Sequence, residues 1–201
     1  MRKRYKNIYQ FKIILKYIKP LIWRHILVPE TYTFWDLHIA IQDAMGWTDS
    51  HLHEFAIINP STGRKVVIGI PDEGFDFDMG RTTLPDTKQK ISKWFTAQND
   101  KAEYIYDFGD NWEHTVKLEK ILPREKDVDY PLCIAGARAC PPEDCGGIGG
   151  YAYFLDIIMD PDHKEYEEML EWAGGDFDPE HFKPNEVCFD DPDDRFEYAF
   201  S

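Results

Sequence analysis

Long apolar runs are missing from this sequence of 201 residues, because no stretch reaches the roughly 18 uninterrupted apolar residues of a membrane span. The basic start MRKRYKN leads into FKIILKYIK, where lysines interrupt every apolar segment, so the pattern of a secretory leader is missing as well. The four cysteines form no C-x2-C pair. We therefore expect a cytoplasmic protein without membrane contact, whose thiols are reduced or bind a metal ion rather than form disulfides.

Positive charge is scarce outside the first residues. The net charge is -14, yet residues 1–30 hold eight Lys and Arg against one Glu, which gives +7, while residues 124–201 hold six against twenty-one acids, which gives -15. An acidic surface repels phosphate backbones, so broad nucleic-acid binding is disfavoured. The basic segment 1–30 either docks an acidic partner or carries the solvated face of a strand.

Apolar periodicity divides the chain into strands followed by helices. Alternation predicts strands over residues 9–18, 22–28, 51–58 and 64–70, and a hairpin of residues 102–108 and 112–121. Helical spacing predicts helices over residues 33–45, 151–159 and 163–173, the first and last opened by capping boxes at Thr33–Asp36 and Asp162–Glu165. Residues 71–87 read as a loop, and Asp178-Pro179 as the start of one more helical turn.

This order of elements indicates the fold class. Strands come early and helices late, without βαβ alternation, so we predict a single α+β domain over residues 1–189. An antiparallel or mixed sheet packs against three to four helices in this fold. Residues 190–201 are rich in Asp and predict an acidic, mobile tail.

Residues 130–160 concentrate cysteine, proline and glycine just before an apolar segment. Cys133, Cys140 and Cys145 offer thiolate ligands for zinc, although their C-x6-C-x4-C spacing differs from paired zinc hooks, and buried thiols are the alternative. The glycines Gly146, Gly147, Gly149 and Gly150 precede a predicted helix. Free N–H groups at a helix start favour an anion, but the Lys-Ser/Thr of a P-loop is missing, so backbone freedom is the alternative use.

A second set of polar residues points to one pocket. His51 and His53 alternate on one predicted strand face, like the H-x-H pairs of some metal enzymes, and zinc or another divalent metal is the cofactor that they imply. Hydrogen-bonded core histidines are the alternative. Together with hairpin residues and aromatics that suit recognition, the candidate pocket comprises His51, His53, Glu54, Asp107, Asp110, Trp112, His114 and Tyr151.

Seven ordered motifs carry a family resemblance. They are IWRHILVP (22–29), LHIAIQDAMGW (37–47), HLHEF (51–55), YDFGDNWEH (106–114), YPLCIAGARACPPEDCGGIGGY (130–151), DPDHKEYEEMLEW (160–172) and FDPEHF (177–182). In these motifs the chain resembles the plasmid pRiA open-reading-frame-three-like family over residues 8–188. The resemblance implies an α+β domain without an established activity, and some members carry a transposon-passenger or TnpR-like resolvase label. Val187-Cys188 departs from the Val-Asn of that family, which weakens a ligand role for Cys188.

The residues argue against the resolvase label. The first serine is Ser50, whereas a serine recombinase needs a nucleophilic serine with arginine neighbours near its N-terminus. None of the seven histidines has an arginine three residues later, as a tyrosine recombinase requires. Without a complete catalytic set, we predict a non-catalytic binding or interaction module of unknown ligand that serves a mobile element. The alternative is a metal-dependent hydrolase that uses His51, His53, Asp107, Asp110 and His114.

Overall fold

The computed structural model describes residues 5–72, 74, 76 and 80–199. Over these residues the chain forms one mixed sheet of eight strands in the order β5-β4-β3-β6-β7-β1-β2-β8. The strands are β1 (Asn7–Leu15), β2 (Trp23–Pro29), β3 (His53–Ile58), β4 (Lys65–Gly69), β5 (Thr83–Pro85), β6 (Lys101–Tyr106), β7 (Trp112–Pro123) and β8 (Leu132–Ala137). Neighbouring strands are antiparallel except for β4 and β5, which are parallel.

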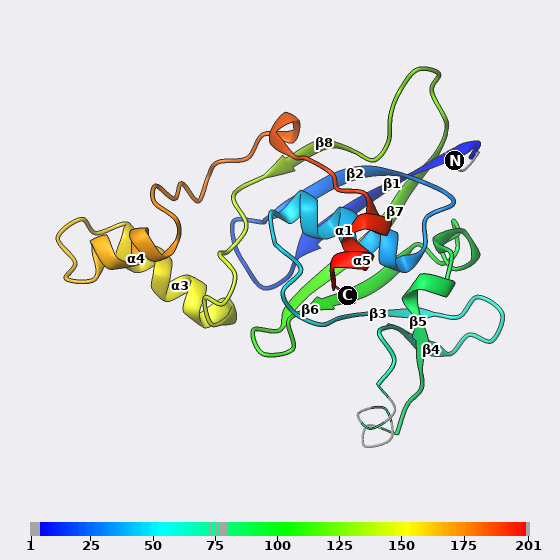
Figure 1. The fold of residues 1–201 in the computed structure, drawn as a ribbon, viewed down its shortest axis with the longest axis horizontal. Coiled ribbons are helices and arrows are strands. Elements are labelled where there is room, and N and C mark those ends of the chain that lie inside the picture. Colours follow the sequence, from blue (N-terminus) through cyan, green and yellow to red (C-terminus); the bar gives the residue numbers. More distant parts are fainter. Residues whose placement is uncertain (1–4, 73, 75, 77–79, 200–201) are drawn as a thin grey trace.

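Four α-helices complete the described part of the fold: α1 (Phe34–Met45), α3 (Gly147–Ile158), α4 (Tyr166–Trp172) and α5 (Pro192–Ala199). Short 3-10 turns lie at Asp86–Lys88, Ile91–Lys93 and Pro184–Glu186. Figure 1 shows α1 and α5 stacked over one face of the sheet, whereas α3 and α4 extend to one side. The predicted α+β class, with a mixed sheet and helices, is confirmed. Among the described residues, no helix is long and apolar enough to cross a membrane.

Helix α1 forms where the sequence predicts it. The Thr33 side chain accepts a hydrogen bond from the Asp36 N–H at 3.2 Å, and the Asp36 carboxylate accepts one from the Thr33 N–H at 2.8 Å, which is the predicted capping box. Gly46 ends the helix in the left-handed region, with φ of 91°. Almost every residue of α1 is buried, because the helix lies between the sheet and α5.

Helix α5 replaces part of the predicted tail. The sequence predicts a mobile acidic segment over residues 190–201, but residues 192–199 are helical. The Trp35 indole N–H donates to the Pro192 carbonyl at 2.9 Å, and the rings of Trp35 and Phe196 meet edge to face at 5.5 Å. An aromatic side chain of α1 therefore anchors a segment whose own sequence is dominated by aspartate.

Four other predictions of local structure are wrong. Strand β5 lies in the segment 71–87 that is predicted to be a loop, and α3 starts four residues before its predicted first residue. Helix α4 begins only at Tyr166, and Asp162 does not cap it. Residues 178–181 make a turn rather than a helix. Strand β8 is an edge strand with little burial, so its sequence LCIAGA lacks the alternation that reveals a strand.

A buried arginine joins three of these elements. Arg24 on β2 is almost completely buried and donates four hydrogen bonds to main-chain carbonyls, those of Ala44 at 2.7 Å, Trp23 at 2.9 Å, Ala137 at 2.9 Å and Arg138 at 2.8 Å. The guanidinium carbon lies 3.7 Å from the centroid of the Phe182 ring. Because the Ala44 carbonyl belongs to the last turn of α1, the helix dipole also favours this cation.

Candidate functional site

Three sequence motifs meet at one end of the sheet. The Trp47 indole N–H donates to the Pro141 carbonyl at 2.9 Å, so the residues that follow α1 contact the Pro-Pro segment. The Asp107 N–H donates to the Leu52 carbonyl at 2.9 Å, and the Gly146 N–H donates to Asp110 Oδ2 at 3.1 Å. The segments HLHEF, YDFGDNWEH and ACPPEDCGGIGGY therefore build one continuous surface.

His51, Asp107 and Asp144 form the cluster at this junction. His51 Nε2 lies 2.9 Å from Asp144 Oδ1 and 3.7 Å from Asp107 Oδ2. One ligand atom from each residue lies within 4.8 Å of the other two, which is a spacing that one metal ion can span. Although its distance to Asp144 is short, His51 Nε2 has no hydrogen bond of good geometry to any described residue. One imidazole nitrogen and two carboxylate oxygens thus converge at this junction.

The backbone fixes two members of the cluster. Asp107 and Asp144 have φ angles of 56° and 58°, in the left-handed region that Asp tolerates better than most residues. Asp107 Oδ1 accepts the Gly109 N–H at 2.8 Å, which leaves Oδ2 directed toward His51. The side chain of Asp107 is 10% exposed and that of Asp144 is 70% exposed, so the cluster is open to solvent on the Asp144 side.

A hydrogen-bonded tyrosine holds the Asp144 loop in place. The Tyr106 hydroxyl donates to Glu143 Oε1 at 2.5 Å and accepts the Ser50 N–H at 2.9 Å. The Thr48 hydroxyl also donates to Glu143. Burial, and then the neighbouring Glu143 carboxylate, raise the pKa of Tyr106. Residues 48–50 and Glu143 are therefore tied together through β6, next to the cluster.

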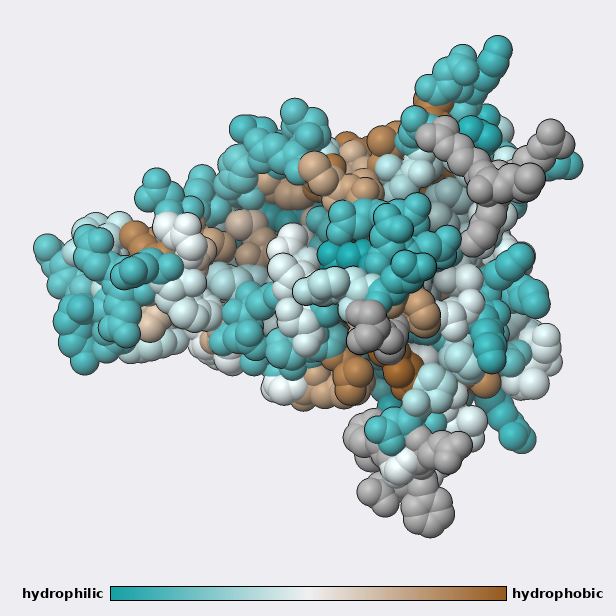
Figure 2. Space-filling view, in the orientation of Figure 1, coloured by the Kyte–Doolittle hydropathy of each residue, from teal (hydrophilic) through white to brown (hydrophobic). Residues whose placement is uncertain are grey.

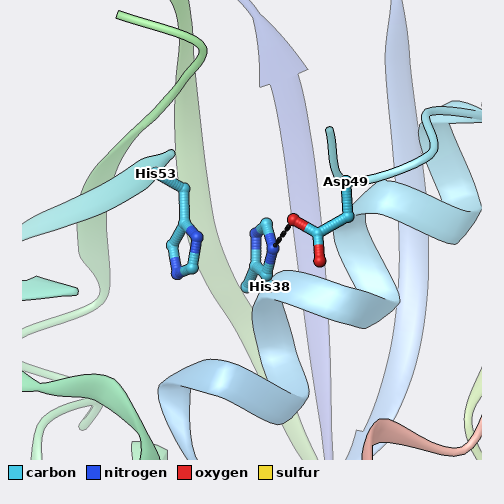
Figure 3. Close-up of side chains that lie close together, drawn as sticks. All are labelled: His38, Asp49 and His53. Carbon is cyan, nitrogen blue, oxygen red and sulfur yellow. Dashed lines mark hydrogen bonds and ion pairs between the residues drawn. The ribbon is translucent and has the colours of Figure 1, made fainter. Parts of the chain in front are cut away.

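His53 belongs to a different, buried network, of which Figure 3 shows the side chains of His38, Asp49 and His53. Its ring stacks on His38 of α1, with centroids 3.5 Å apart and planes 9° apart. Both ring nitrogens of His38 have partners, the Tyr104 hydroxyl at 2.8 Å and Asp49 at 2.7 Å, and His53 Nε2 lies 3.0 Å from Asp86.

This second network suits structure better than metal binding. His38, Asp49 and His53 also have ligand atoms within 4.8 Å of one another. The lone pairs of parallel stacked rings cannot converge on one ion, and the hydrogen bonds of His38 already occupy both its nitrogens. Burial, followed by the charge of His53, lowers the pKa of His38 to about 4, so the ring is neutral near pH 7.

The remaining residues of the predicted pocket do not join the cluster. His114 is buried and packs edge to face against Trp47, with centroids 5.4 Å apart, and burial lowers its pKa to about 3. Trp112 and Tyr151 are buried in the core, and Glu54 pairs with Arg81 at 2.6 Å. Of the five residues in the hydrolase hypothesis, the structure thus brings together only His51 and Asp107. Asp110 lies adjacent to them, where its carboxylate accepts the Gly146 N–H.

The glycines serve close packing at the start of α3. The carboxylate of Asp110 accepts the Gly146 N–H, in the place where the sequence predicts an external anion. A Cβ at Gly147 would lie 2.6 Å from the Asp110 carbonyl oxygen, and one at Gly150 would lie 1.7 Å from the Cys145 carbonyl oxygen. A fixed carboxylate repels phosphate, so the geometry argues against the anion site at residues 146–150.

The cysteines do not converge on a common point. Among the residues that the structure describes, no group of metal-ligating atoms within 4.8 Å of one another includes a cysteine. Burial raises the pKa of Cys133 and Cys140, and raises that of Cys145 to about 12, so the thiols are protonated near pH 7. The predicted zinc site at Cys133, Cys140 and Cys145 is therefore not assembled, and these side chains pack against the core instead.

The comparisons with known proteins agree with this architecture. A sequence profile described as "Plasmid pRiA4b ORF-3-like protein" matches residues 7–186. The chain belongs to this family. Within it, the chain is 36% identical over 176 residues to "Uncharacterized protein y4hQ" of Sinorhizobium fredii, an alignment that covers 86% of this chain and 84% of that protein.

A solved structure extends the family comparison to the fold. The crystal structure of a protein of unknown function from Methanosarcina mazei Go1, MM3350, is similar to this chain with a TM-score of 0.85 and 48% sequence identity. The similarity covers 92% of this chain and 100% of that protein. This chain therefore shares its fold with a protein of known structure, and a shared fold does not by itself define a function.

Sequence reasoning missed Asp144 and the His38 network. Asp144 follows Pro-Pro-Glu, and the two prolines restrict the backbone just before it. This restriction could have indicated a carboxylate held in a fixed position. His38 lies between apolar residues of α1, where a buried histidine needs a polar partner. The partner, Asp49, lies beyond the end of the helix at Gly46, and it reaches His38 only because the chain turns back there.

Proposed function

We propose that this family member is a ligand-binding module whose site takes a divalent cation at His51, Asp107 and Asp144. The observation that carries the proposal is the convergence of one imidazole nitrogen and two carboxylate oxygens from three separate motifs. His51 Nε2 lies 2.9 Å from Asp144 Oδ1, so a bound metal ion would replace this ion pair with ligand bonds to the same two side chains.

The donor set decides which ions fit. Imidazole and carboxylate ligands suit zinc, manganese or iron, and three protein ligands leave coordination positions for water or for a group of a bound partner. On one side of the site, the Gly109 N–H donates to Asp107 Oδ1 and so orients the Asp107 carboxylate. The exposed side chain of Asp144 lies on the open side, from which an incoming ligand reaches the ion.

A metal-dependent hydrolase is the second candidate function. It is favoured by the same open coordination position, because a metal-bound water is a nucleophile near neutral pH. In this alternative Asp144 joins His51 and Asp107 of the five residues that the sequence suggests, since His53 and His114 are buried elsewhere. Turnover of a generic phosphate or carboxylate ester that depends on zinc and is lost in Asp107→Asn would favour the enzyme, whereas binding of zinc without turnover favours the module.

Isothermal titration calorimetry of the metal-free protein with zinc tests the proposal. We expect one site per chain in the wild type, and a loss of affinity of about tenfold or more in His51→Gln, Asp107→Asn and Asp144→Asn. The matched controls are His163→Gln and Asp156→Asn, which change the same residue types on the α3–α4 arm and should leave the affinity unchanged. Zinc affinity that is equal in the site variants and in the controls would refute the site.

A further inference from the structure

A second concave region lies away from the His51 cluster. It is a cleft of about 440 Å³ between Tyr32, the segment before α5 and the residues that connect β7 to β8. Figure 2 shows hydrophilic residues gathered over α5 and the segment that leads to it. Three tyrosines and Phe189 contribute aromatic rings to the lining of this cleft.

The cleft already contains a contact between a guanidinium and an aromatic ring. The guanidinium carbon of Arg124 lies 4.6 Å from the centroid of the Tyr5 ring. Tyr5 in turn meets Tyr130 edge to face, with centroids 6.4 Å apart. Aromatic faces attract cations through the ring quadrupole, and arginine is the side chain that stacks on them best. Arg124 already covers one face of the Tyr5 ring, so the tyrosine rings that remain for an incoming planar cation are those of Tyr32 and Tyr130.

The charge of the lining has the complementary sign. Five aspartates and one arginine line the cleft. Asp190, Asp191 and Asp193 are exposed and follow one another closely at the start of α5. Burial first, and then the nearby Asp36 carboxylate, raise the pKa of Tyr32, which lines the cleft. Aromatic walls and an excess of carboxylates together fit a cationic guest.

We propose that this cleft binds an arginine side chain of a basic peptide segment. Its guanidinium stacks on the tyrosine rings and pairs with the carboxylates of Asp191 and Asp193. A guanidinium fits better than an ammonium because it is planar, weakly hydrated and able to bind a carboxylate through two N–H groups. This inference is independent of the cation site at His51, because the two sites share no residue.

Fluorescence anisotropy with a labelled peptide tests the proposal. The probe carries two arginines separated by glycines, and its counterparts carry lysine or citrulline at the same positions. We expect the arginine probe to bind most tightly, the lysine probe more weakly, and the uncharged citrulline probe not at all. The double variant Asp191→Asn/Asp193→Asn should weaken binding of the arginine probe by about fivefold or more.

Two matched variants separate the cleft from general electrostatic attraction. Asp160→Asn/Asp162→Asn changes the net charge equally but lies between α3 and α4, so it should leave the affinity unchanged. Tyr130→Leu should weaken binding, whereas Tyr153→Leu, which removes an exposed tyrosine from α3, should not. Equal losses in the two double variants, equal binding of the citrulline probe, or no binding of the arginine probe would each overturn the proposal.

Discussion

Two adjacent glycines at the start of α3 should respond to alanine in opposite directions. A Cβ at Gly149 meets nothing within 4 Å, whereas a Cβ at Gly150 would lie 1.7 Å from the Cys145 carbonyl oxygen and 2.7 Å from its carbon. Gly149→Ala removes an unfavourable helix residue and should stabilise the protein by about 0.5–1 kcal/mol. Gly150→Ala forces main-chain atoms apart and should cost about 3 kcal/mol, at the upper end of overpacking effects.

Thermal and urea unfolding of the two variants measure this difference. The separation of about 4 kcal/mol corresponds to a gap of roughly 8–16 °C between their midpoints for a domain of this size. Because both substitutions add one methyl group to the same helix, propensity alone predicts equal shifts. Midpoints that agree within about 2 °C would refute the claim that Gly150 is needed for the close approach of Cys145 to α3.

Two further predictions concern the buried polar groups. Arg24→Met leaves four main-chain carbonyls without their donor and should destabilise the fold by about 3 kcal/mol. The control Arg64→Met, at an exposed site, should change the free energy of unfolding by less than about 0.5 kcal/mol. A loss below about 1 kcal/mol for Arg24→Met would contradict the role of the guanidinium. Burial lowers the pKa of His38 to about 4 and of His114 to about 3, so both stay neutral in the folded state while the unfolded chain takes up protons below pH of about 6.5. Above that pH, the free energy of unfolding from urea titrations should therefore be independent of these groups, and it should fall as the pH drops toward 4. His114→Leu should reduce the slope of this free energy against pH by up to about 1.4 kcal/mol per pH unit. An unchanged slope in this variant would count against a neutral, buried His114.

Local signals were sufficient where the determinants of an element lie within it. The capping box and the Gly46 stop define α1, and alternation defines the β6–β7 hairpin. Strand β8 and helix α5 depend instead on distant partners, since β8 pairs with β2 and α5 packs on Trp35. Sequence patterns cannot report such partners, because the exposed edge strand and the acidic helix lack an apolar stripe of their own.

The candidate site was half predictable for a related reason. The H-x-H interpretation places His51 and His53 on one face, which requires the strand to include both residues. Strand β3 begins at His53, so His51 precedes it and follows a different backbone direction. The sequence therefore finds His51 and Asp107 but assigns His53 to the wrong group, and the third donor, Asp144, comes from a loop that only the fold brings near.

Zinc-edge anomalous diffraction from crystals of the zinc-loaded protein would locate the ion bound at His51, Asp107 and Asp144. We expect one strong peak at about 2.0–2.2 Å from His51 Nε2, Asp107 Oδ2 and Asp144 Oδ1. A peak between His38, Asp49 and His53, a peak at the cysteines, or no peak at the junction of the three motifs would contradict it.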